Sequence, residues 1–375
     1  MTAMQRRENQ RSSMQLVASR TPTFQRVLIV RFGALGDMVL LTPMIQRLQQ
    51  RFGVPVDLVS SGSWTRPLLE GQPGVGEIML VGSRRRPYFL SPDQQRLVRW
   101  LRERGPTPTW FAHPHDVGRD LLRRGRIPDE FVCDFTHVIP GEHDADRWVR
   151  FADDTPAVLG QAYPPPALPR PSHAFLQVTS AMRSDLQPWL HRHGLADQSL
   201  IAIQAGNKRT MRSWNRRRVT NKKYWPEERW AEVIRAVRQD CPRSAIVLLG
   251  VPQESDLNED IIRAARVTNI HNVANDLPVP ILIALLERTD SMISVDTGPA
   301  HVAAAVGCPV VTLFADADPA RYRPGGRDSS SVVLQGHIDG QPNILGIDAA
   351  RVIAAWREIP QRVPDRAPAE ALAGQ

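Results

Sequence analysis

Short apolar runs alternate with stretches of helical periodicity along much of the chain. The β-branched run VLIVRF, residues 27–32, has the length and composition of a buried strand, and apolar residues then recur at helical spacing up to Gly53. We expect Thr42 to cap this helix at its N-terminus, with Pro43 in the first helical position and Gly53 as the stop. A second strand is expected at residues 54–60. Strand, helix and strand within about 35 residues predict a βαβ unit and hence a parallel sheet.

The alternation is less regular in the middle of the chain and returns beyond a proline-rich stretch, YPPPALPRP, at residues 163–171. Proline continues neither a helix nor a central strand, so this stretch is expected to mark a linker or a domain edge. The later strands are expected at residues 200–205, 244–250, 269–273, 291–296 and 309–314. The later helices are expected at residues 180–193, 226–240, 254–266, 278–289, 299–307 and 348–359. This order predicts an α/β protein with two doubly wound domains, which bind ligands at the carboxyl ends of their strands.

The length of 375 residues also favours two domains over one. The expected divisions are a disordered leader at 1–24, a first domain at 25–172, a second domain at 173–345, a C-terminal helix at 346–360 and a loose tail at 361–375. No run of 18 apolar residues and no signal-peptide pattern occurs, so we expect a cytoplasmic protein. The three cysteines lie far apart in sequence and suit reduced thiols better than a disulfide framework or a zinc site.

The net charge of +8 is unevenly spread along the chain. Between Asn207 and Lys223 there are eight Lys or Arg and no acid, and smaller arginine clusters occur at Arg84–Arg86 and Arg119–Arg126. A basic surface attracts anions, so nucleic acid, acidic lipid headgroups and phosphorylated small molecules all stay open as partners. A solvated basic loop without a specific ligand also stays open.

The turn after the first strand, residues 33–37, is the first candidate site. A dinucleotide-binding turn needs G-x-G-x-x-G and an acid at the end of the next strand, and a Walker loop needs Gly-Lys-Ser/Thr; the chain has neither here. What remains is a strand-to-helix turn that places Asp37 in the space above the sheet. Its carboxylate could accept a proton from a substrate hydroxyl, or it could simply cap the first helical turn.

Two features of the second domain suit a phosphorylated ligand. Asp296-Thr297-Gly298 follow a predicted strand and Pro299 opens a helix, whose N–H groups and positive end could bind a diphosphate or belong to an ordinary capped helix. Lys223 precedes a Trp-Pro helix start at the carboxyl side of the strand at 200–205. A lysine opposite the 296–301 turn would neutralise charge on a phosphate leaving group, although it could also be one more solvated lysine.

Metal-ligating residue types occur at close spacing in two places. These are His113-Pro114-His115-Asp116 and Asp316-Ala317-Asp318. Neither brings a third and a fourth ligand at a recognisable separation, so we interpret both as structural and predict no metal site.

Three motifs taken together, FGALGDMVLLTP, KKYWPEERW and SVDTGPAHVAAAVGCPVVTLF, resemble glycosyltransferase family 9, the bacterial heptosyltransferases of lipopolysaccharide core assembly. The resemblance runs from about Arg26 to about Pro324. It implies the GT-B architecture, in which two Rossmann-like domains face each other across a cleft. It further implies that the first domain holds the acceptor and that the second holds a nucleotide-sugar, commonly ADP-heptose.

The resemblance also implies roles for individual residues. Asp37 matches the proposed general base and Lys223 the lysine that contacts the donor phosphate, in a metal-independent, inverting transfer without a further cofactor. Gly36 is expected on the acceptor side of the site. The expected donor-binding residues are Gly206, Glu254, Asp296, Thr297, Gly298, Pro299 and His301. One departure is the segment from Phe314 to Pro319, where the family often has a glycine-proline-threonine turn.

The implied acceptor is an anionic glycolipid or glycan, and the basic 207–223 segment leaves open an association with the inner face of the cytoplasmic membrane. A family-9-like transferase with a non-lipopolysaccharide acceptor is one alternative. A second class, a nucleic-acid or anionic-surface binding protein, would use Trp214 among arginines for stacking and phosphate contact, but it leaves Asp37 and the 296–301 turn without a role. A non-catalytic homologue is a third.

Overall fold

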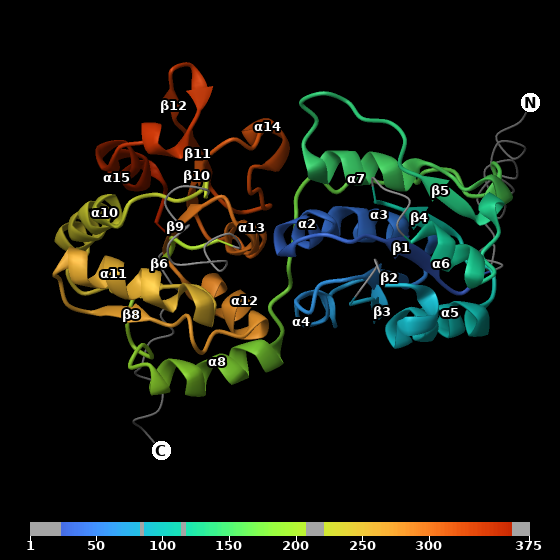
Figure 1. Ribbon diagram of the computed structural model, residues 1–375, viewed down its shortest axis with the longest axis horizontal. Coiled ribbons are helices and arrows are strands. Elements are labelled where there is room, and N and C mark those ends of the chain that lie inside the picture. Colours follow the sequence, from blue (N-terminus) through green and yellow to red (C-terminus); the bar gives the residue numbers. More distant parts are fainter. Residues whose placement is uncertain (1–23, 83–85, 114–117, 208–220, 362–375) are drawn as a thin grey trace, which may run out of the picture.

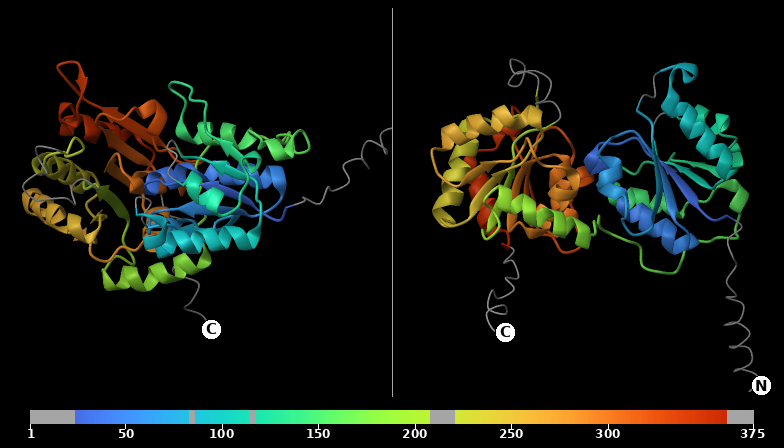
Figure 2. Two further views of the ribbon diagram at one scale, coloured as in Figure 1. Left: turned by 45° about the vertical axis from the view of Figure 1, so that its right-hand side comes forward. Right: turned by 90° about the horizontal axis from the view of Figure 1, so that it is seen from below.

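The computed structural model describes residues 24–82, 86–113, 118–207 and 221–361. Two parallel sheets lie side by side, and helices cover both faces of each sheet (Figures 1 and 2). This is the α/β architecture with two Rossmann-like domains that the alternating pattern predicted. The leader and the tail expected at the two ends lie almost entirely outside the described residues.

The first sheet has five parallel strands in the order β3-β2-β1-β4-β5. Its strands are β1 (Val27–Val30), β2 (Val56–Ser60), β3 (Val75–Leu80), β4 (Thr109–Phe111) and β5 (Val132–Asp134). Its helices are α2 (Leu35–Leu40), α3 (Thr42–Phe52), α4 (Thr65–Leu69), α5 (Pro92–Arg104), α6 (Arg119–Arg124) and α7 (Asp144–Asp153). The central strand β1 is fully buried, as its β-branched run predicted, because helices cover both faces of a parallel sheet.

The second sheet has six parallel strands in the order β11-β10-β9-β6-β7-β8. Its strands are β6 (Leu200–Gln204), β7 (Ala245–Leu248), β8 (Ile270–Asn272), β9 (Ser291–Val295), β10 (Val310–Phe314) and β11 (Ser331–Gln335). Its helices are α8 (Ser180–Arg192), α10 (Glu227–Asp240), α11 (Ser255–Ala265), α12 (Val279–Arg288), α13 (Gly298–Ala305), α14 (Pro319–Tyr322) and α15 (Ala349–Glu358), and a short hairpin joins β12 (His337–Ile338) to β13 (Gln341–Pro342). The five strands expected here are confirmed with ends shifted by one or two residues; β11 was not predicted.

The expected N-cap at Thr42 is wrong. The chain already becomes helical at Leu35, and Leu41 separates α2 from α3. Thr42 lies inside the helical stretch, where its hydroxyl donates a hydrogen bond to the Val39 carbonyl at 2.8 Å, as threonine hydroxyls commonly do within helices. The stop at Gly53 is confirmed, with φ of 67° in the left-handed region that favours glycine.

The proline-rich stretch contains neither helix nor strand, and two arginines of α3 hold it against the first domain. The Arg47 guanidinium donates to the Pro166 and Leu168 carbonyls at 3.1 and 3.0 Å. The Arg51 guanidinium donates to the Tyr163 carbonyl. The chain therefore runs along the first domain before it crosses to the second.

The two domains meet where α2 packs against α13 (Figure 1). A Cβ built on Gly36 would lie 2.6 Å from Cδ2 of His301, and one built on Gly298 would lie 2.9 Å from Cβ of Leu35. Two glycines, one on each helix, thus allow the close approach of the domains. Within the described residues, no helix has the length and apolar character needed to cross a bilayer.

Candidate active site

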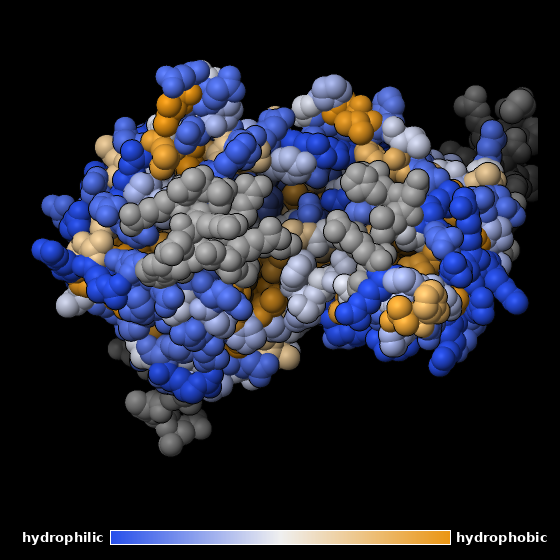
Figure 3. Space-filling model, viewed as in Figure 1, coloured by the Kyte–Doolittle hydropathy of each residue, from blue (hydrophilic) through white to orange (hydrophobic). Residues whose placement is uncertain are grey.

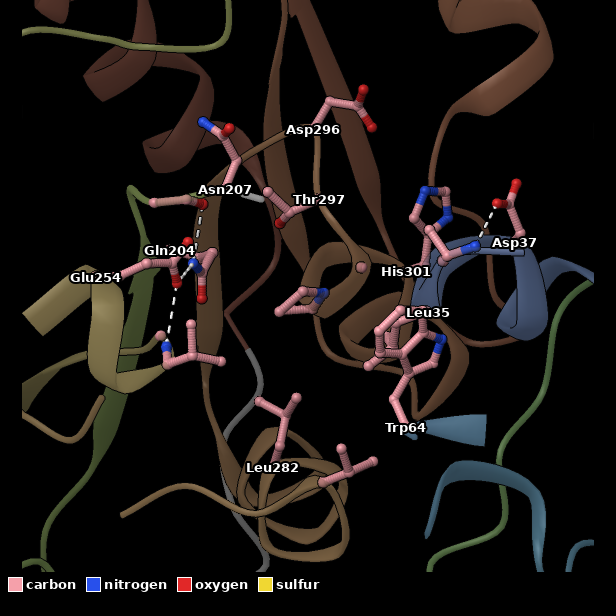
Figure 4. Close-up of a pocket in the computed structure, with 18 of the residues that line it drawn as sticks. Leu35, Asp37, Trp64, Gln204, Asn207, Glu254, Leu282, Asp296, Thr297 and His301 are labelled. Atoms are coloured by element: carbon pink, nitrogen blue, oxygen red, sulfur yellow. Dashed lines mark hydrogen bonds between the residues drawn. The ribbon is translucent and has the colours of Figure 1, made fainter. Parts of the chain in front are cut away.

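A pocket of about 1010 Å³ lies between the domains and is lined by residues of both (Figure 4). It is bounded by the turn after β1, by α4, and by the loops that follow β6, β7 and β9. Every residue expected in the site contributes to its wall, from Gly36 and Asp37 on the first domain to Gly206, Lys223, Glu254, Asp296, Thr297, Gly298, Pro299 and His301 on the second. The structure therefore brings together residues more than 250 positions apart in sequence.

Asp37 lies in the first turn of α2 and its side chain is about one-third exposed to the pocket. The backbone N–H of Ala34 donates to Oδ2 at 2.7 Å, and the guanidinium of Arg31 lies 3.4 Å from Oδ1. Arg31 is itself fixed by a 3.0 Å hydrogen bond to the Ala112 carbonyl. The two interpretations of Asp37, cap and base, are thus compatible, because the capping bond fixes a carboxylate that still faces the pocket.

Lys223 reaches the turn after β9, where its ammonium group contacts the Asp296 carboxylate and donates to the Asp296 carbonyl at 2.8 Å. The lysine and the turn therefore share one edge of the second sheet, as the order of the motifs suggested. Thr297 is the N-cap of α13, and Pro299, which has no N–H, lies in its first turn. The helix leaves the N–H groups of residues 297–300 without an intrahelical partner, and since Pro299 has none, Gly298 and Ala300 are the backbone donors of its first turn.

His301 is buried at the domain interface with its imidazole between Asp296 and Asp37 (Figure 4). Burial lowers the pKa of His301, although both carboxylates act in the opposite direction. Burial therefore favours the neutral form of the ring. Its Nδ1 is buried and has no hydrogen-bond partner among the described residues.

Glu254 lies at the other side of the pocket, beside Gly206 (Figure 4). Its Oε2 accepts hydrogen bonds from the Val251 N–H at 3.1 Å and from Gln204 Nε2 at 3.2 Å. Burial raises the pKa of the Glu254 carboxyl group. A Cβ on Gly206 would lie 2.6 Å from the Glu254 carboxyl carbon, so the absence of a side chain at this position makes room for the carboxylate in the pocket wall.

The sequence patterns did not identify an apolar part of the pocket. Trp64, just before α4, and Pro67 extend the wall on the first domain, and Leu277, Val279 and Leu282 line it on the second. Figure 4 shows Trp64 and Leu282 away from the Glu254 and Asp296 end of the pocket. A ligand of this pocket would thus meet polar and charged groups at one end and apolar side chains at the other.

An ion-pair network across the domains also escaped the sequence analysis. Asp144 at the start of α7 is buried, and its Oδ1 lies 2.8 Å from Arg147 and 2.9 Å from Arg321 of the second domain. Nearby, Nε2 of His143 lies 2.9 Å from the Arg323 carbonyl. These contacts join α7 to α14, beside the packing of α2 on α13.

The remaining candidates behave as ordinary structural residues where they are described. Asp316 pairs with Lys222 at 2.9 Å, and Asp318 caps α14. Residues 114–117 of the first metal candidate, and residues 208–220 of the basic segment, lie outside the described residues. Within the described ranges, no group of three or more His, Cys, Asp or Glu is arranged to hold a metal ion.

Sequence comparison finds similarity to one family of known proteins. The model of glycosyltransferase family 9 (heptosyltransferase) matches residues 202–344. Lipopolysaccharide heptosyltransferase 2 of Salmonella typhimurium is 23% identical over 321 residues, which are 78% of this chain and 84% of the relative. Lipopolysaccharide heptosyltransferase 3 of Escherichia coli K12 is 34% identical over 104 residues, a match that spans only 27% of this chain and 30% of the relative.

Solved structures agree on the fold. The crystal structure of the family 9 glycosyl transferase from Veillonella parvula has a TM-score of 0.71 at 19% identity and covers 89% of this chain and 96% of that one. The E. coli heptosyltransferase WaaC, solved with ADP-2-deoxy-2-fluoro heptose, has a TM-score of 0.63 at 18% identity. The match covers 89% of this chain and 99% of that one. The fold is thus that of the GT-B glycosyltransferases. The resemblance to glycosyltransferase family 9 that the three motifs predicted is confirmed by the family model, which matches part of the second domain, and by the curated relatives.

Proposed function

We propose that this protein is an inverting glycosyltransferase that moves a heptose, or a related sugar, from an ADP-sugar to an acceptor hydroxyl in the assembly of lipopolysaccharide core or another cell-envelope glycan. The observation that carries the proposal is the pocket itself. Asp37 of the first domain shares it with Lys223 and the Asp296–His301 turn of the second. A proton acceptor and a phosphate-binding edge thus flank one space large enough for a nucleotide-sugar.

Asp37 is the proposed general base. It removes the proton of the acceptor hydroxyl while the oxygen bonds to the anomeric carbon of the sugar. The bond from that carbon to the phosphate oxygen breaks through an oxocarbenium-like state, and its electron pair leaves with ADP. The Ala34 N–H and Arg31 hold the carboxylate in one orientation, which is what a base that must meet one hydroxyl requires.

Lys223 and the first turn of α13 are the proposed binding site of the diphosphate. The ammonium group lies within contact of the turn, and the N–H groups of Gly298 and Ala300 are at the positive end of the helix. Charge that develops on the leaving diphosphate would meet these groups without reorganisation. We propose that they serve in place of a metal ion.

Glu254 is the proposed partner of the donor ribose. Its carboxylate lies in the pocket wall with Oε2 engaged by Gln204 and Val251, and ribose hydroxyls can donate to the remaining lone pairs. The similarity to the E. coli enzyme solved with an ADP-heptose analogue supports the choice of an ADP-sugar. The lipopolysaccharide heptosyltransferases among the relatives support an anionic glycolipid acceptor, and with it a site of action at the inner face of the cytoplasmic membrane.

The direct test measures glycosylated product by mass spectrometry and ADP release, with ADP-heptose and a lipid acceptor. Asp37→Asn keeps the size of the side chain and an oxygen for the Ala34 N–H, so transfer should fall by about 10²- to 10⁴-fold with donor affinity unchanged. Asp256→Asn, at a first-turn position of α11, is the matched control and should leave transfer intact. Transfer by Asp37→Asn within a few-fold of the wild type would exclude this carboxylate as the base.

Lys223→Met tests the diphosphate site separately. Donor affinity measured by calorimetry should fall at least about tenfold, because a charge-assisted contact to phosphate is lost. Lys222→Met is the control, since the Lys222 side chain is 65% exposed and its ammonium group pairs with Asp316. Equal donor affinity in the two variants would refute the role of Lys223. Binding of short oligonucleotides with steep salt dependence, but of no nucleotide-sugar, would favour the nucleic-acid interpretation instead.

A further inference from the structure

A short turn after β3 exposes two large apolar side chains. Phe89 is 74% exposed and Leu90 is 60% exposed, although both lie in an ordered 3-10 turn, η1 (Tyr88–Leu90). The turn is fastened to the first turn of α5, because Nε2 of Gln95 donates to the carbonyls of Tyr88 and Phe89 at 3.2 Å each. The backbone is therefore held in place while the two side chains project outward.

One arginine packs on this turn, and others lie on the neighbouring helices α5 and α6. The guanidinium of Arg124 lies 4.8 Å above the Tyr88 ring, and Nε of Arg102 donates to the Arg124 carbonyl, which ties α6 to α5. Among the described residues from 86 to 126 there are nine arginines and three acids. Seven of the arginines are exposed, namely Arg86, Arg96, Arg99, Arg102, Arg123, Arg124 and Arg126. Figure 3 shows the result over α5, an apolar patch bordered by hydrophilic surface.

The turn lies at the edge of the first domain that carries the active site. All five strands of the first sheet are parallel, so the chain leaves β3 at the same edge as it leaves β1. Asp37 follows β1 and η1 follows β3. Any surface to which η1 binds would therefore lie at the edge of the first domain that also carries Asp37.

We propose that Phe89, Leu90 and the surrounding arginines dock this protein on a lipid bilayer with anionic headgroups. Two apolar side chains on a convex turn bury far less area than the roughly 800 Å² that each partner contributes to a stable protein interface. They suit insertion into the boundary between headgroups and acyl chains, while the arginines attract negative lipids. The inference deepens the proposed function and rests on it, because a bilayer at this edge would present a lipid-linked acceptor to the first domain.

The test is co-sedimentation of the full chain with vesicles of phosphatidylcholine alone and with about 30% phosphatidylglycerol, at low and high salt. The wild type should bind the anionic vesicles, and binding should weaken at high salt. Phe89→Ser/Leu90→Ser should weaken this binding about tenfold or more. Leu168→Ser/Ile338→Ser removes two exposed apolar side chains elsewhere and should bind like the wild type. Arg96→Glu/Arg99→Glu should lose the preference for anionic vesicles. Circular dichroism checks that each variant is folded.

Equal binding by Phe89→Ser/Leu90→Ser and the wild type would overturn the proposal, as would wild-type binding that is indifferent to lipid charge. A change of oligomeric state in this variant, seen by sedimentation velocity, would assign the turn to a second copy of the chain and also overturn it. Transfer to a water-soluble acceptor fragment should be unchanged in the variant. If no transfer occurs with any acceptor while vesicle binding behaves as expected, the proposed function fails and the docking surface stands.

Discussion

The substitution Gly36→Ala should have opposite effects on the stability of the first domain and on the packing of the two domains against each other. Gly36 is the second residue of α2, and its φ lies outside the left-handed region, so alanine can adopt the same backbone conformation. Within the first domain alone, alanine is the better helix former by about 1 kcal/mol. The new Cβ, however, would lie 2.6 Å from Cδ2 and 3.2 Å from Nε2 of His301.

The His301 ring has little freedom to move aside, since only 6% of the residue is exposed. Inserting a methyl group into such packing costs about 1–3 kcal/mol, and only when the domains are together. The domain arrangement seen in the structure should therefore be disfavoured by about 5- to 150-fold, at about 1.4 kcal/mol per factor of ten. The same substitution should leave the thermal stability of the first domain unchanged or slightly raised. These opposite signs distinguish the interface effect from general destabilisation.

The assay compares sugar transfer, donor affinity and thermal unfolding in Gly36→Ala and the wild type. Transfer should fall by a larger factor than donor affinity, because Asp37 lies on the first domain, whereas Lys223 and Glu254 of the proposed donor site lie on the second. Gly325→Ala is the matched control, since a Cβ at this position meets nothing within 4 Å. Wild-type transfer by Gly36→Ala would show that the contact of α2 with α13 is not needed in the reaction, and the reasoning would be refuted.

Three further outcomes are expected. Asp144→Asn removes the charge that pairs with Arg321, and urea unfolding should show a loss of about 3 kcal/mol, whereas Asp260→Asn in an exposed pair should cost less than about 1 kcal/mol. Burial raises the pKa of Glu254 above its unfolded value, so the native state loses stability as pH rises through the folded pKa and the carboxyl group ionises. Glu254→Gln should therefore be more stable than the wild type at pH 8, with an advantage that shrinks toward pH 4, and its donor affinity should be lower. Burial raises the pKa of Cys133 to about 12, so alkylation followed by mass spectrometry should be slow at pH 8 in the native chain and fast in the denatured one.

The sequence predicted most of what buried parallel strands require. Runs rich in β-branched residues mark β1 and β10, because helices cover both faces of these strands. Four strands of the two parallel sheets were missed, namely β3, β4, β5 and β11. Of these, β3, β5 and β11 lie at sheet edges and are only partly buried, and β4 and β5 have only three residues each, so their composition is less distinctive. Thr42 was misplaced because a Thr-Pro pair is a common helix start, and local pattern does not show that the preceding turn is already helical.

The limits of local sequence pattern also explain which residues of the site were predicted and which were missed. The strands of a parallel sheet all end at the same edge, where such proteins bind their ligands. This was enough to expect Lys223 beside the turn after β9, and the structure has that contact. Trp64 was missed because it lines a pocket that only the two domains together form, and the pair of Asp144 and Arg321 was missed because it joins the two domains. No local spacing of residue types records such a contact.

The arginines of α3 that bind the proline-rich stretch also determine where this chain could be joined to the second domain of a relative. Composition alone would suggest a crossover within residues 163–171, since exposed proline-rich linkers usually tolerate exchange. Here Arg47 and Arg51 bind that stretch as part of the first domain. The backbone of Gln177 exchanges two hydrogen bonds with the side chain of Gln72 in the first domain. A chimera that takes its second domain from a relative should therefore keep the sequence of this chain through Gln177 and continue with that of the relative from the start of α8.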